Sequence, residues 1–483
     1  MRRPNILICM TDHQRADTVL AEHPAVTPNL ARLAADGLTF TNVYCPSPHC
    51  CPARATFHTG LYPSRHGVWN NICNDQALSR GLNAGVRCFG EDLAEAGYDL
   101  AFTGKWHVST LTTPGDHGWR ELSFSGHKPR EHHTAWEQYE KLAERPDATE
   151  RGEGEILRPG YGTYRLYGTN EPRPDSHDER TIAEALEELP KLAAGEQPWC
   201  LFVGLIGPHD PYNVPKRFAD LHDLKDVALP ASYEDTFQDK PRVYSKMRDM
   251  RFGQLSAREV REGIRHFWAY CSYLDDLFGK LLAALDATGQ ADDTLVLYTS
   301  DHGDYCGEHG LFAKGIPCFS GAYHVPGVVR WPAGLAGRGR RADELVSLAD
   351  FAPTFVELAG SQPDASLTGR SLAPFLRGEA PGDWRDEIHT QCNGVELYYT
   401  QRSVRTPTHK YVFNGFDVDE LYDLRADPHE MVNLAGEPAC EPIKRELVRR
   451  MWRFAHREQD GAINGYITVS LAPYGPAEAF RES

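Results

Sequence analysis

Four groups of polar residues with the chemistry of an active site recur along the chain, each directly after a short apolar run. In open α/β sheets, ligands bind beyond the carboxyl ends of the strands, so groups in this position are expected to converge on one site. Carboxylates and imidazoles bind divalent metal ions, whereas lysines and histidines bind anions and transfer protons. The four groups are Asp12–His13, Lys105–His107, His209–Asp210 and Asp301–His302.

A cysteine motif stands apart from these groups, in the stretch PHCCPARATFHTG. It fits the pattern C-x-P-x-R, and Pro52 and Arg54 fix the register so that Cys50, not Cys51, is its first residue. Here the chain resembles the type I sulfatases, the formylglycine-dependent branch of the alkaline-phosphatase superfamily. In that family the cysteine of the motif is oxidised after translation to formylglycine.

The resemblance extends over residues 4 to about 456 and rests on the cysteine motif and five further matches in the same order. A single C-x-P-x-R motif would be weak, but ordered matches at expected strand ends are specific. Besides Asp12 and the cysteine motif, the matching stretches are GKWH at 104–107, GPHDPY at 207–212, SDHGDYCGEHGLFAKG at 300–315 and ELYDLRADPHEMVNLA at 420–435.

The resemblance implies one divalent metal ion, held by Asp12, Asp301, His302 and the modified Cys50. Oxygen-rich ligands favour a hard ion, with Ca²⁺ first and Mg²⁺ next, while the imidazole leaves Mn²⁺ open. His13 stands where the commonest family pattern has a second aspartate. It is equally compatible with a metal ligand and with a residue that caps the strand.

The resemblance also implies roles for the remaining groups. Arg54 and Lys105 would hold the hydrated formylglycine and the sulfate, and His107 would be the base that triggers sulfate elimination. His209 and Lys314 would contact the sulfate, one of them protonating the leaving oxygen. Each residue also has a plain structural interpretation: the aspartates as helix caps, His209 as a structural histidine and Lys314 as a solvent-exposed side chain.

The predicted function is therefore hydrolysis of small sulfate monoesters, with a formylglycine-generating enzyme as maturation partner. The closest alternative is a phosphonate monoester or phosphodiester hydrolase with the same fold and nucleophile. Those relatives tend to lack the lysine and histidine found here at Lys105 and His107, which favours sulfate esters. An alternative of another class is a non-catalytic binding protein with an unmodified Cys50, which the intact set of polar residues argues against.

The elements that must position these residues are apolar strands alternating with helices. Apolar runs at 5–10, 199–206 and 294–299 lack alternation, as buried parallel strands do. Helical patterns occupy 183–194 and about 256–288. This order predicts an α/β fold with a doubly wound, mostly parallel central sheet flanked by helices.

Two further features concern organisation. Residues 120–178 and 207–250 are rich in Gly, Pro, Tyr, His and charge, and we expect long excursions above the sheet that form a pocket wall. A composition shift near 374–384 predicts a catalytic domain at 1–375 and a smaller C-terminal α+β domain with a tail at 376–483. The irregular residues 461–483 are expected to reach back over the first domain.

Composition limits the possible partners. The chain has 483 residues, 51 of them basic and 68 acidic, for a net charge of −17, which argues against nucleic-acid binding through a general basic field. Local cations still allow an anionic substrate. The apolar run at 6–10 is too short for a signal peptide, and no stretch suits a membrane span. Twelve cysteines without a CxxC pair indicate neither a zinc knuckle nor a disulfide framework. We expect a cytoplasmic protein without a membrane partner, compatible with a homo-oligomer.

Overall fold

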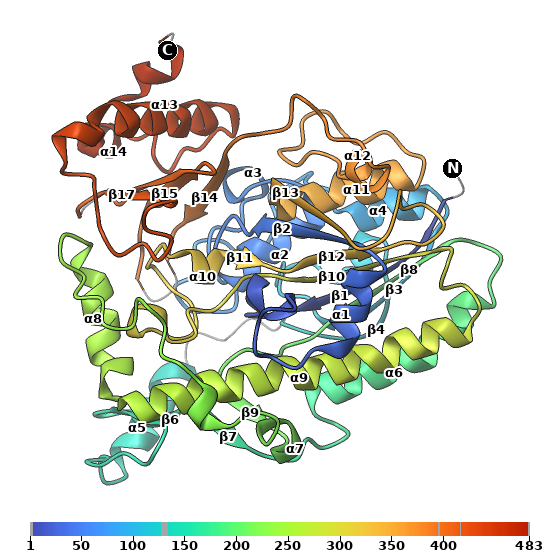
Figure 1. Ribbon diagram of the computed structural model, residues 1–483, viewed down its shortest axis with the longest axis horizontal. Helices are drawn as coiled ribbons and strands as arrows, with labels where there is room; N and C mark the ends of the chain where they lie inside the picture. Colours follow the sequence, from blue (N-terminus) through green and yellow to red (C-terminus); the bar gives the residue numbers. More distant parts are fainter. Residues whose placement is uncertain (1–2, 127–133, 395–396, 416, 482–483) are drawn as a thin grey trace.

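The computed structural model describes residues 3–126, 134–394, 397–415 and 417–481. Its centre is a nine-stranded sheet of order β11-β2-β12-β10-β1-β8-β3-β4, with β13 beside β2 (Figure 1). The strands are β1 (Asn5–Thr11), β2 (Leu38–Tyr44), β3 (Asp99–Lys105), β4 (Arg120–Ser125), β8 (Trp199–Gly204), β10 (Thr294–Ser300), β11 (His324–Val325), β12 (Gly327–Arg330) and β13 (Arg340–Ser347).

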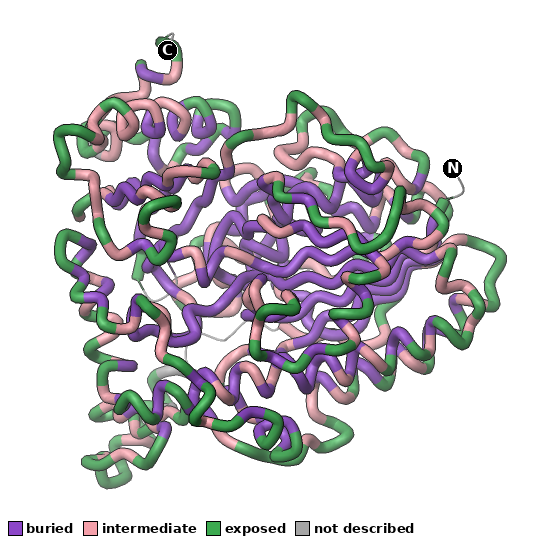
Figure 2. The backbone as a smooth tube through the Cα atoms, viewed as in Figure 1, coloured by how far each residue is buried: buried purple, intermediate pink, exposed green. Residues whose placement is uncertain are grey.

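Strand β1 lies in the middle of this sheet and pairs in parallel with β10 and β8. Its side chains alternate between two cores: Ile6, Ile8 and Met10 contact one, and Leu7 and Cys9 the other. Because both faces are covered, the strand is apolar throughout, which explains why its sequence shows no alternation. The buried strands form the central band of Figure 2.

Helices cover both faces of the sheet. The core that includes Leu7 and Cys9 is closed by α1 (Pro28–Ala35), α6 (His177–Ala193) and α9 (Ala257–Ala287). The opposite core is closed by α2 (Cys50–Thr59), α4 (Phe89–Glu95) and α11 (Phe351–Leu358). Ser256 begins the long α9 as its N-cap, because its hydroxyl accepts a hydrogen bond from the Glu259 N–H and the Glu259 side chain bonds back.

The predicted doubly wound, mostly parallel sheet is confirmed, with two differences in detail. The short strands β11 and β12 run antiparallel to their neighbours. The stretch 120–178 is not wholly an excursion, because its first six residues form the edge strand β4 and its last two begin α6. Between them lie α5 (Thr134–Ala143), the hairpin β5 (Glu155–Arg158) and β6 (Gly162–Arg165), and β7 (Tyr167–Thr169).

The stretch 207–250 is likewise partly regular. It contains β9 (Tyr212–Val214), α7 (Lys216–Ala219) and α8 (Arg242–Met250). Strand β9 pairs with β7, so the two excursions are joined by backbone hydrogen bonds. They form a connected layer rather than two independent loops.

The C-terminal part is a four-stranded antiparallel sheet with a helix packed on it, as the α+β prediction requires. The strands are β14 (Ile388–Cys392), β15 (Gln401–Arg405), β16 (His409–Phe413) and β17 (Glu420–Asp423). Helix α13 (Glu441–Arg457) shares a separate core with them. The sheet lies beside the main sheet in Figure 1. The boundary between residues 375 and 376 stays a prediction.

The expectation for the tail is wrong. Helix α14 (Tyr466–Leu471) and the short turn η8 (Pro476–Phe480) follow α13 and pack on it, not on the first domain. The Trp452 indole donates to the Tyr474 carbonyl oxygen over 2.7 Å, and Arg445 pairs with Glu478 at 2.8 Å. The physical reason is that α13 uses one face on the small sheet and leaves another for the tail to cover.

Across the described residues, no helix combines the length and apolar character that a bilayer crossing requires. None of the twelve cysteines, all of which lie in the described part of the chain, forms a disulfide.

Candidate active site

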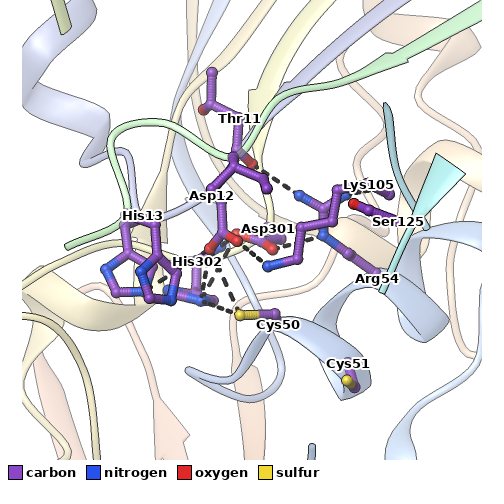
Figure 3. Close-up of polar contacts among 12 residues, drawn as sticks. Thr11, Asp12, His13, Cys50, Cys51, Arg54, Lys105, Ser125, Asp301 and His302 are labelled. Atoms are coloured by element: carbon purple, nitrogen blue, oxygen red, sulfur yellow. Dashed lines mark hydrogen bonds and ion pairs between the residues drawn. The ribbon is translucent and has the colours of Figure 1, made fainter. Parts of the chain in front are cut away.

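The side chain of Cys50 lies at the first residue of α2 and points into a cluster of polar groups (Figure 3). Its sulfur is 3.3 Å from His302 Nε2 and 3.6 Å from Asp12 Oδ1. Cys51 points away from the cluster, and its sulfur accepts a hydrogen bond from the Ile72 N–H. Of the two adjacent cysteines, Cys50 is therefore the one that the fold presents to the cluster.

The electrostatic environment separates the two thiols. Burial and the Asp12 carboxylate would raise the pKa of Cys50, but Lys105, Lys314 and His302 together lower it well below its ordinary value. Burial and the neighbouring Cys50 raise the pKa of Cys51 well above its ordinary value. A cationic environment that stabilises a thiolate at residue 50 also suits any anion bound there.

Two aspartates meet in the cluster because their strands pair in parallel and end together. Thr11 of β1 stands opposite Ser300 of β10, so the next residues, Asp12 and Asp301, emerge at the same edge of the sheet. His302 follows at once, and its Nε2 lies 3.3 Å from Asp12 Oδ1. Asp12, Asp301 and His302 are fully buried.

This set of donors fits a divalent metal ion. One donor atom each from Asp12, Cys50, Asp301 and His302 lies within 4.8 Å of all the others. Burial would lower the pKa of His302, but Asp301, Cys50 and Asp12 raise it to about 10. A position that stabilises a proton so strongly also stabilises a bound cation.

Two cations brace the carboxylates. Arg54 Nε donates to Asp301 Oδ2 over 2.7 Å, and its Nη1 donates to the Lys105 carbonyl oxygen over 2.8 Å. Lys105 in turn donates to Asp12. Arg54 is fully buried and Lys105 nearly so. In this structure Arg54 holds the Asp301 carboxylate in place; the roles predicted for Arg54 and Lys105 toward the nucleophile and the sulfate stay predictions.

His13 lies inside the site, not at the surface. Its Nδ1 is 3.1 Å from Asp304 Oδ2, and its Nε2 faces Lys314. The Tyr212 hydroxyl donates to the same oxygen of Asp304 over 2.8 Å. Burial raises the pKa of Asp304 to about 7. The arrangement orients His13 with one ring nitrogen toward the cluster. His13, Asp12, Cys50 and His209 form a second group whose donor atoms lie close together.

His209 and Lys314 form the more open side of the site. His209 follows β8 in the loop 207–212, and its Nε2 is 3.0 Å from Lys314 Nζ. Its Nδ1 lies 3.2 Å from Asp210 Oδ1, and 30% of its side chain is exposed. Burial and Lys314 would lower the pKa of His209, but Asp210 and its other neighbours raise it overall. The structural alternative for Lys314 required a solvent-exposed side chain. Instead, the side chain is partly buried beside His209.

His107 follows β3 with a backbone φ of +57°. Its Nδ1 is buried and has no hydrogen-bond partner among the described residues. Burial and Lys105 lower the pKa of its imidazole to about 4, so the ring is neutral at pH 7 and free to accept a proton. The structure thus brings the other nine predicted site residues around Cys50, while their chemical roles stay predictions.

Two residues of this site carried no recognised signal in the sequence. His49, the N-cap residue of α2, is buried, and neither of its ring nitrogens has a partner among the described residues. Its place directly before Cys50 could have indicated it. Tyr164, whose hydroxyl donates to Asp210, lies in the β5–β6 hairpin; the sequence indicated a pocket wall at 120–178 but did not single out this residue.

Comparisons with known proteins agree with this geometry. Residues 4–361 match the family model described as Sulfatase, and residues 307–457 match the model described as N-sulphoglucosamine sulphohydrolase, C-terminal. The choline-sulfatase of Rhizobium meliloti is 31% identical, over 90% of this chain and 83% of its own length. The multifunctional alkaline phosphatase superfamily protein PehA of Trinickia caryophylli is 29% identical, over 95% and 97% of the two chains.

Among solved structures, the phosphonate monoester hydrolase SpPMH from Silicibacter pomeroyi superposes with a TM-score of 0.77. The two chains share 24% sequence identity, and the match covers 95% of this chain and 96% of the other. At this level of identity the likeness concerns the fold alone.

Proposed function

The chain belongs to the sulfatase family and is a sulfuric ester hydrolase; within that function, we propose that Cys50 is converted to formylglycine and supplies the nucleophile. The observation that carries the proposal is the position of Cys50. It begins a helix, faces two carboxylates and an imidazole, and lies among Lys105, Lys314 and His302, whose charges favour an anion there.

We propose that Asp12, Asp301 and His302 hold one divalent ion together with residue 50, and that His13 completes the set. When bound, the ion supplies positive charge to a sulfate oxygen, and the hydrated formylglycine supplies a hydroxyl that attacks sulfur. Ca²⁺ stays our first candidate because Asp12, Asp301 and the hydrated formylglycine supply oxygen ligands, and Mg²⁺ and Mn²⁺ are the alternatives. Two imidazoles at the site support Mn²⁺ more than a purely oxygen-lined site would.

Among the remaining residues, the lysines stabilise negative charge and the histidines transfer protons. Lys105 and Lys314 are the cations next to residue 50, and they lower the free energy of an anionic sulfate there. His107 is neutral at pH 7 because burial and Lys105 lower its pKa to about 4, which supports its role as the base in sulfate release. His209 has a raised pKa and a partly exposed ring, which support its role as the acid toward the leaving oxygen. Arg54 fixes Asp301 and the Lys105 backbone.

A phosphonate monoester or phosphodiester is the second candidate substrate. Lys105 and His107 both lie in the site, which supports sulfate esters, because hydrolases of the other type tend to lack this pair. A binding protein with an unmodified Cys50 would have no use for paired acid and base groups around the thiol.

Location and partners complete the proposal. Twelve cysteines without a disulfide support a reducing, cytoplasmic environment, where disulfides are rare. A cytoplasmic enzyme needs a small substrate that has entered the cell, and its maturation partner is a formylglycine-generating enzyme. A homo-oligomer is compatible with this proposal.

The test is activity of protein made together with a formylglycine-generating enzyme and loaded with one metal at a time. Matched sulfate, phosphonate and phosphodiester substrates with the same alcohol should show the highest kcat/KM for the sulfate. Peptide mass spectrometry should find the cysteine-to-formylglycine mass change at Cys50. A change at Cys51, or full activity with both cysteines unmodified, would contradict the proposed nucleophile.

A further inference from the structure

A row of aromatic rings leads from the molecular surface toward the candidate active site. Trp136 and Tyr139 of α5 lie 5.9 Å apart between ring centroids, and Tyr139 lies 6.0 Å from Tyr161 at the tip of the β5–β6 hairpin. The Arg158 guanidinium is 5.5 Å from the Tyr161 ring and 5.0 Å from the Tyr164 ring. We call these five residues the aromatic row. In Figure 1, α5 and β6 lie at the lower left, beside the start of α9.

The register of the hairpin explains this placement. Ile156 pairs with Tyr164, and Arg158 pairs with Gly162. Residues two apart on a strand share a face, so Ile156, Arg158 and Tyr164 lie on one face of the hairpin. Ile156 is fully buried and anchors that face. The side chain of Gln254 exchanges two hydrogen bonds with the backbone of Leu157, at 2.9 and 3.0 Å, which fixes the hairpin to the protein.

The inner end of the row contacts Asp210, the neighbour of His209. The Tyr164 hydroxyl donates to Asp210 Oδ2, and Asp210 Oδ1 lies 3.2 Å from His209 Nδ1. His209 is the residue proposed to face the leaving oxygen. The row therefore begins on the side of the site where the alcohol part of an ester departs.

The outer rings of the row are exposed, and Arg158, which lies between Tyr161 and Tyr164, has no carboxylate partner among the described residues. Trp136, Tyr139 and Tyr161 are 73%, 42% and 48% exposed. Contiguous exposed aromatics of this kind mark binding surfaces. Within the described residues, Arg158 forms no ion pair with a carboxylate, although its guanidinium is held between two rings. An arginine preorganised in this way binds carboxylate or sulfate groups with little loss of side-chain entropy.

We propose that the aromatic row binds the alcohol part of the substrate, and that this alcohol has at least two rings, with a carboxylate or a second sulfate on the outer ring. The inference rests on the proposed sulfatase function and specifies its substrate class. Two side chains, Asp210 and Tyr164, lie between His209 and Arg158, so a group that reaches the guanidinium extends past the first ring. The rings of the row stack on the substrate rings, and Arg158 pairs with the outer anion.

The test compares two sulfated disaccharides that differ only in whether the outer ring carries a carboxylate. The mature, metal-loaded enzyme should prefer the charged disaccharide in kcat/KM. The Arg158→Ala variant should lower this preference at least about tenfold, mainly through KM, because a charge-assisted hydrogen bond contributes that much. The matched control is Arg165→Ala: Arg165 lies on the opposite face of the same hairpin, 61% exposed and 3.6 Å from Glu155, so its loss should leave the preference intact.

A second measurement separates the inference from the proposed function. Calorimetric titration of Cys50→Ala protein with both disaccharides measures binding without turnover, and the Arg158→Ala change in that background should weaken only the charged ligand. The wild type could lack activity on every sulfate ester and still show this Arg158-dependent binding. That result would contradict the proposed sulfatase chemistry, while the assignment of the aromatic row as a binding surface would stand. Equal effects of Arg158→Ala on both disaccharides would overturn the row as an anion-binding surface. So would a Trp136→Ala variant that changes the oligomeric state in light scattering, since the row would then be an interface between copies.

Discussion

The two sides of the active site are built differently. Asp12, Asp301 and Cys50 follow paired strands or begin a helix, and all three are buried. His209 and Lys314 come from loops, and His209 is 30% exposed. We call the first group the strand side and the second the loop side.

The difference corresponds to the work that each side does. On the strand side, Arg54 and Lys105 pair with both carboxylates, so removal of one member leaves a buried charge without its partner. Groups that bind an ion and a nucleophile need this rigidity. On the loop side, His209 and Lys314 are the residues that we propose to face the leaving alcohol, and loops can vary there without disturbing the proposed metal site. The predictions below test this division, starting with the largest effect.

Replacing the nucleophile should have the largest effect. Cys50→Ala should lower kcat at least about 10⁴-fold, the scale seen when a nucleophile is removed. The fold should persist, because the residue begins a helix and contributes little to the core. Cys51→Ala is the matched control, one residue away but pointing from the cluster, and it should keep most of the activity. Turnover of 4-nitrophenyl sulfate and circular dichroism check both variants; comparable losses in the two would contradict the assignment.

Breaking the strand side should cost stability as well as activity. Asp301→Ala removes a proposed metal ligand and leaves Arg54 buried without its ion pair, which should lower the free energy of unfolding by about 3–5 kcal/mol. Bound metal should be lost together with activity. Urea unfolding and elemental analysis measure the two effects. Full metal occupancy in Asp301→Ala would remove this residue from the ligand set.

Breaking the loop side should give a defect that depends on the leaving group. His209→Ala should slow hydrolysis of alkyl sulfates about 10²–10⁴-fold, the usual contribution of an acid catalyst, and of nitrophenyl sulfate much less. The measurement is kcat/KM over esters with alcohols of graded acidity. Equal losses over the series would leave His209 as a binding residue and transfer the acid role to Lys314.

His107→Ala is the contrasting variant: it should release about one equivalent of alcohol per site before slow turnover.

The smallest effect should come from the support of His13. Asp304→Asn keeps the size of the side chain but weakens the hydrogen bond to His13 Nδ1, which is 3.1 Å long. Loss of such a supporting partner typically lowers metal affinity about 10–100-fold. Metal titration of the apoprotein measures the affinity, with Asp17→Asn, a surface carboxylate paired with Arg15, as control. An unchanged affinity would mean that His13 is not a ligand.

The sequence was sufficient for the strand side and less so for the loop side. Apolar runs followed by Asp12 and Asp301 identify strand ends directly, because a buried parallel strand must be apolar and its end must be polar. The sequence pattern did not predict the edge strand β4, because its six residues are mostly polar and partly exposed. The antiparallel strand β12 has only four residues, too few for a pattern.

The residues that connect the loop side with its surroundings depend on long-range contacts. Tyr164 reaches Asp210 across 46 positions, and Asp304 reaches His13 across 291. No local spacing contains such pairs, so only their types could be predicted and not their partners. The tail was misplaced for the same reason: whether it covered the main sheet or α13 depended on which apolar face was left open.

The pairing of β1 with β10 also determines when, during synthesis of the chain, the central sheet can be completed. The chain is made from its N-terminus, so Cys50 exists long before Ser300, the residue that stands opposite Thr11 at the end of β1. At about 5–20 residues per second, the roughly 250 residues between them take about 12–50 s to synthesise. Throughout that interval the main sheet lacks a central strand, the pocket cannot close, and the cysteine stays within reach of a modifying enzyme. Completion of β10 ends this period, so the proposed modification of Cys50 has to be faster than synthesis of the chain up to that strand.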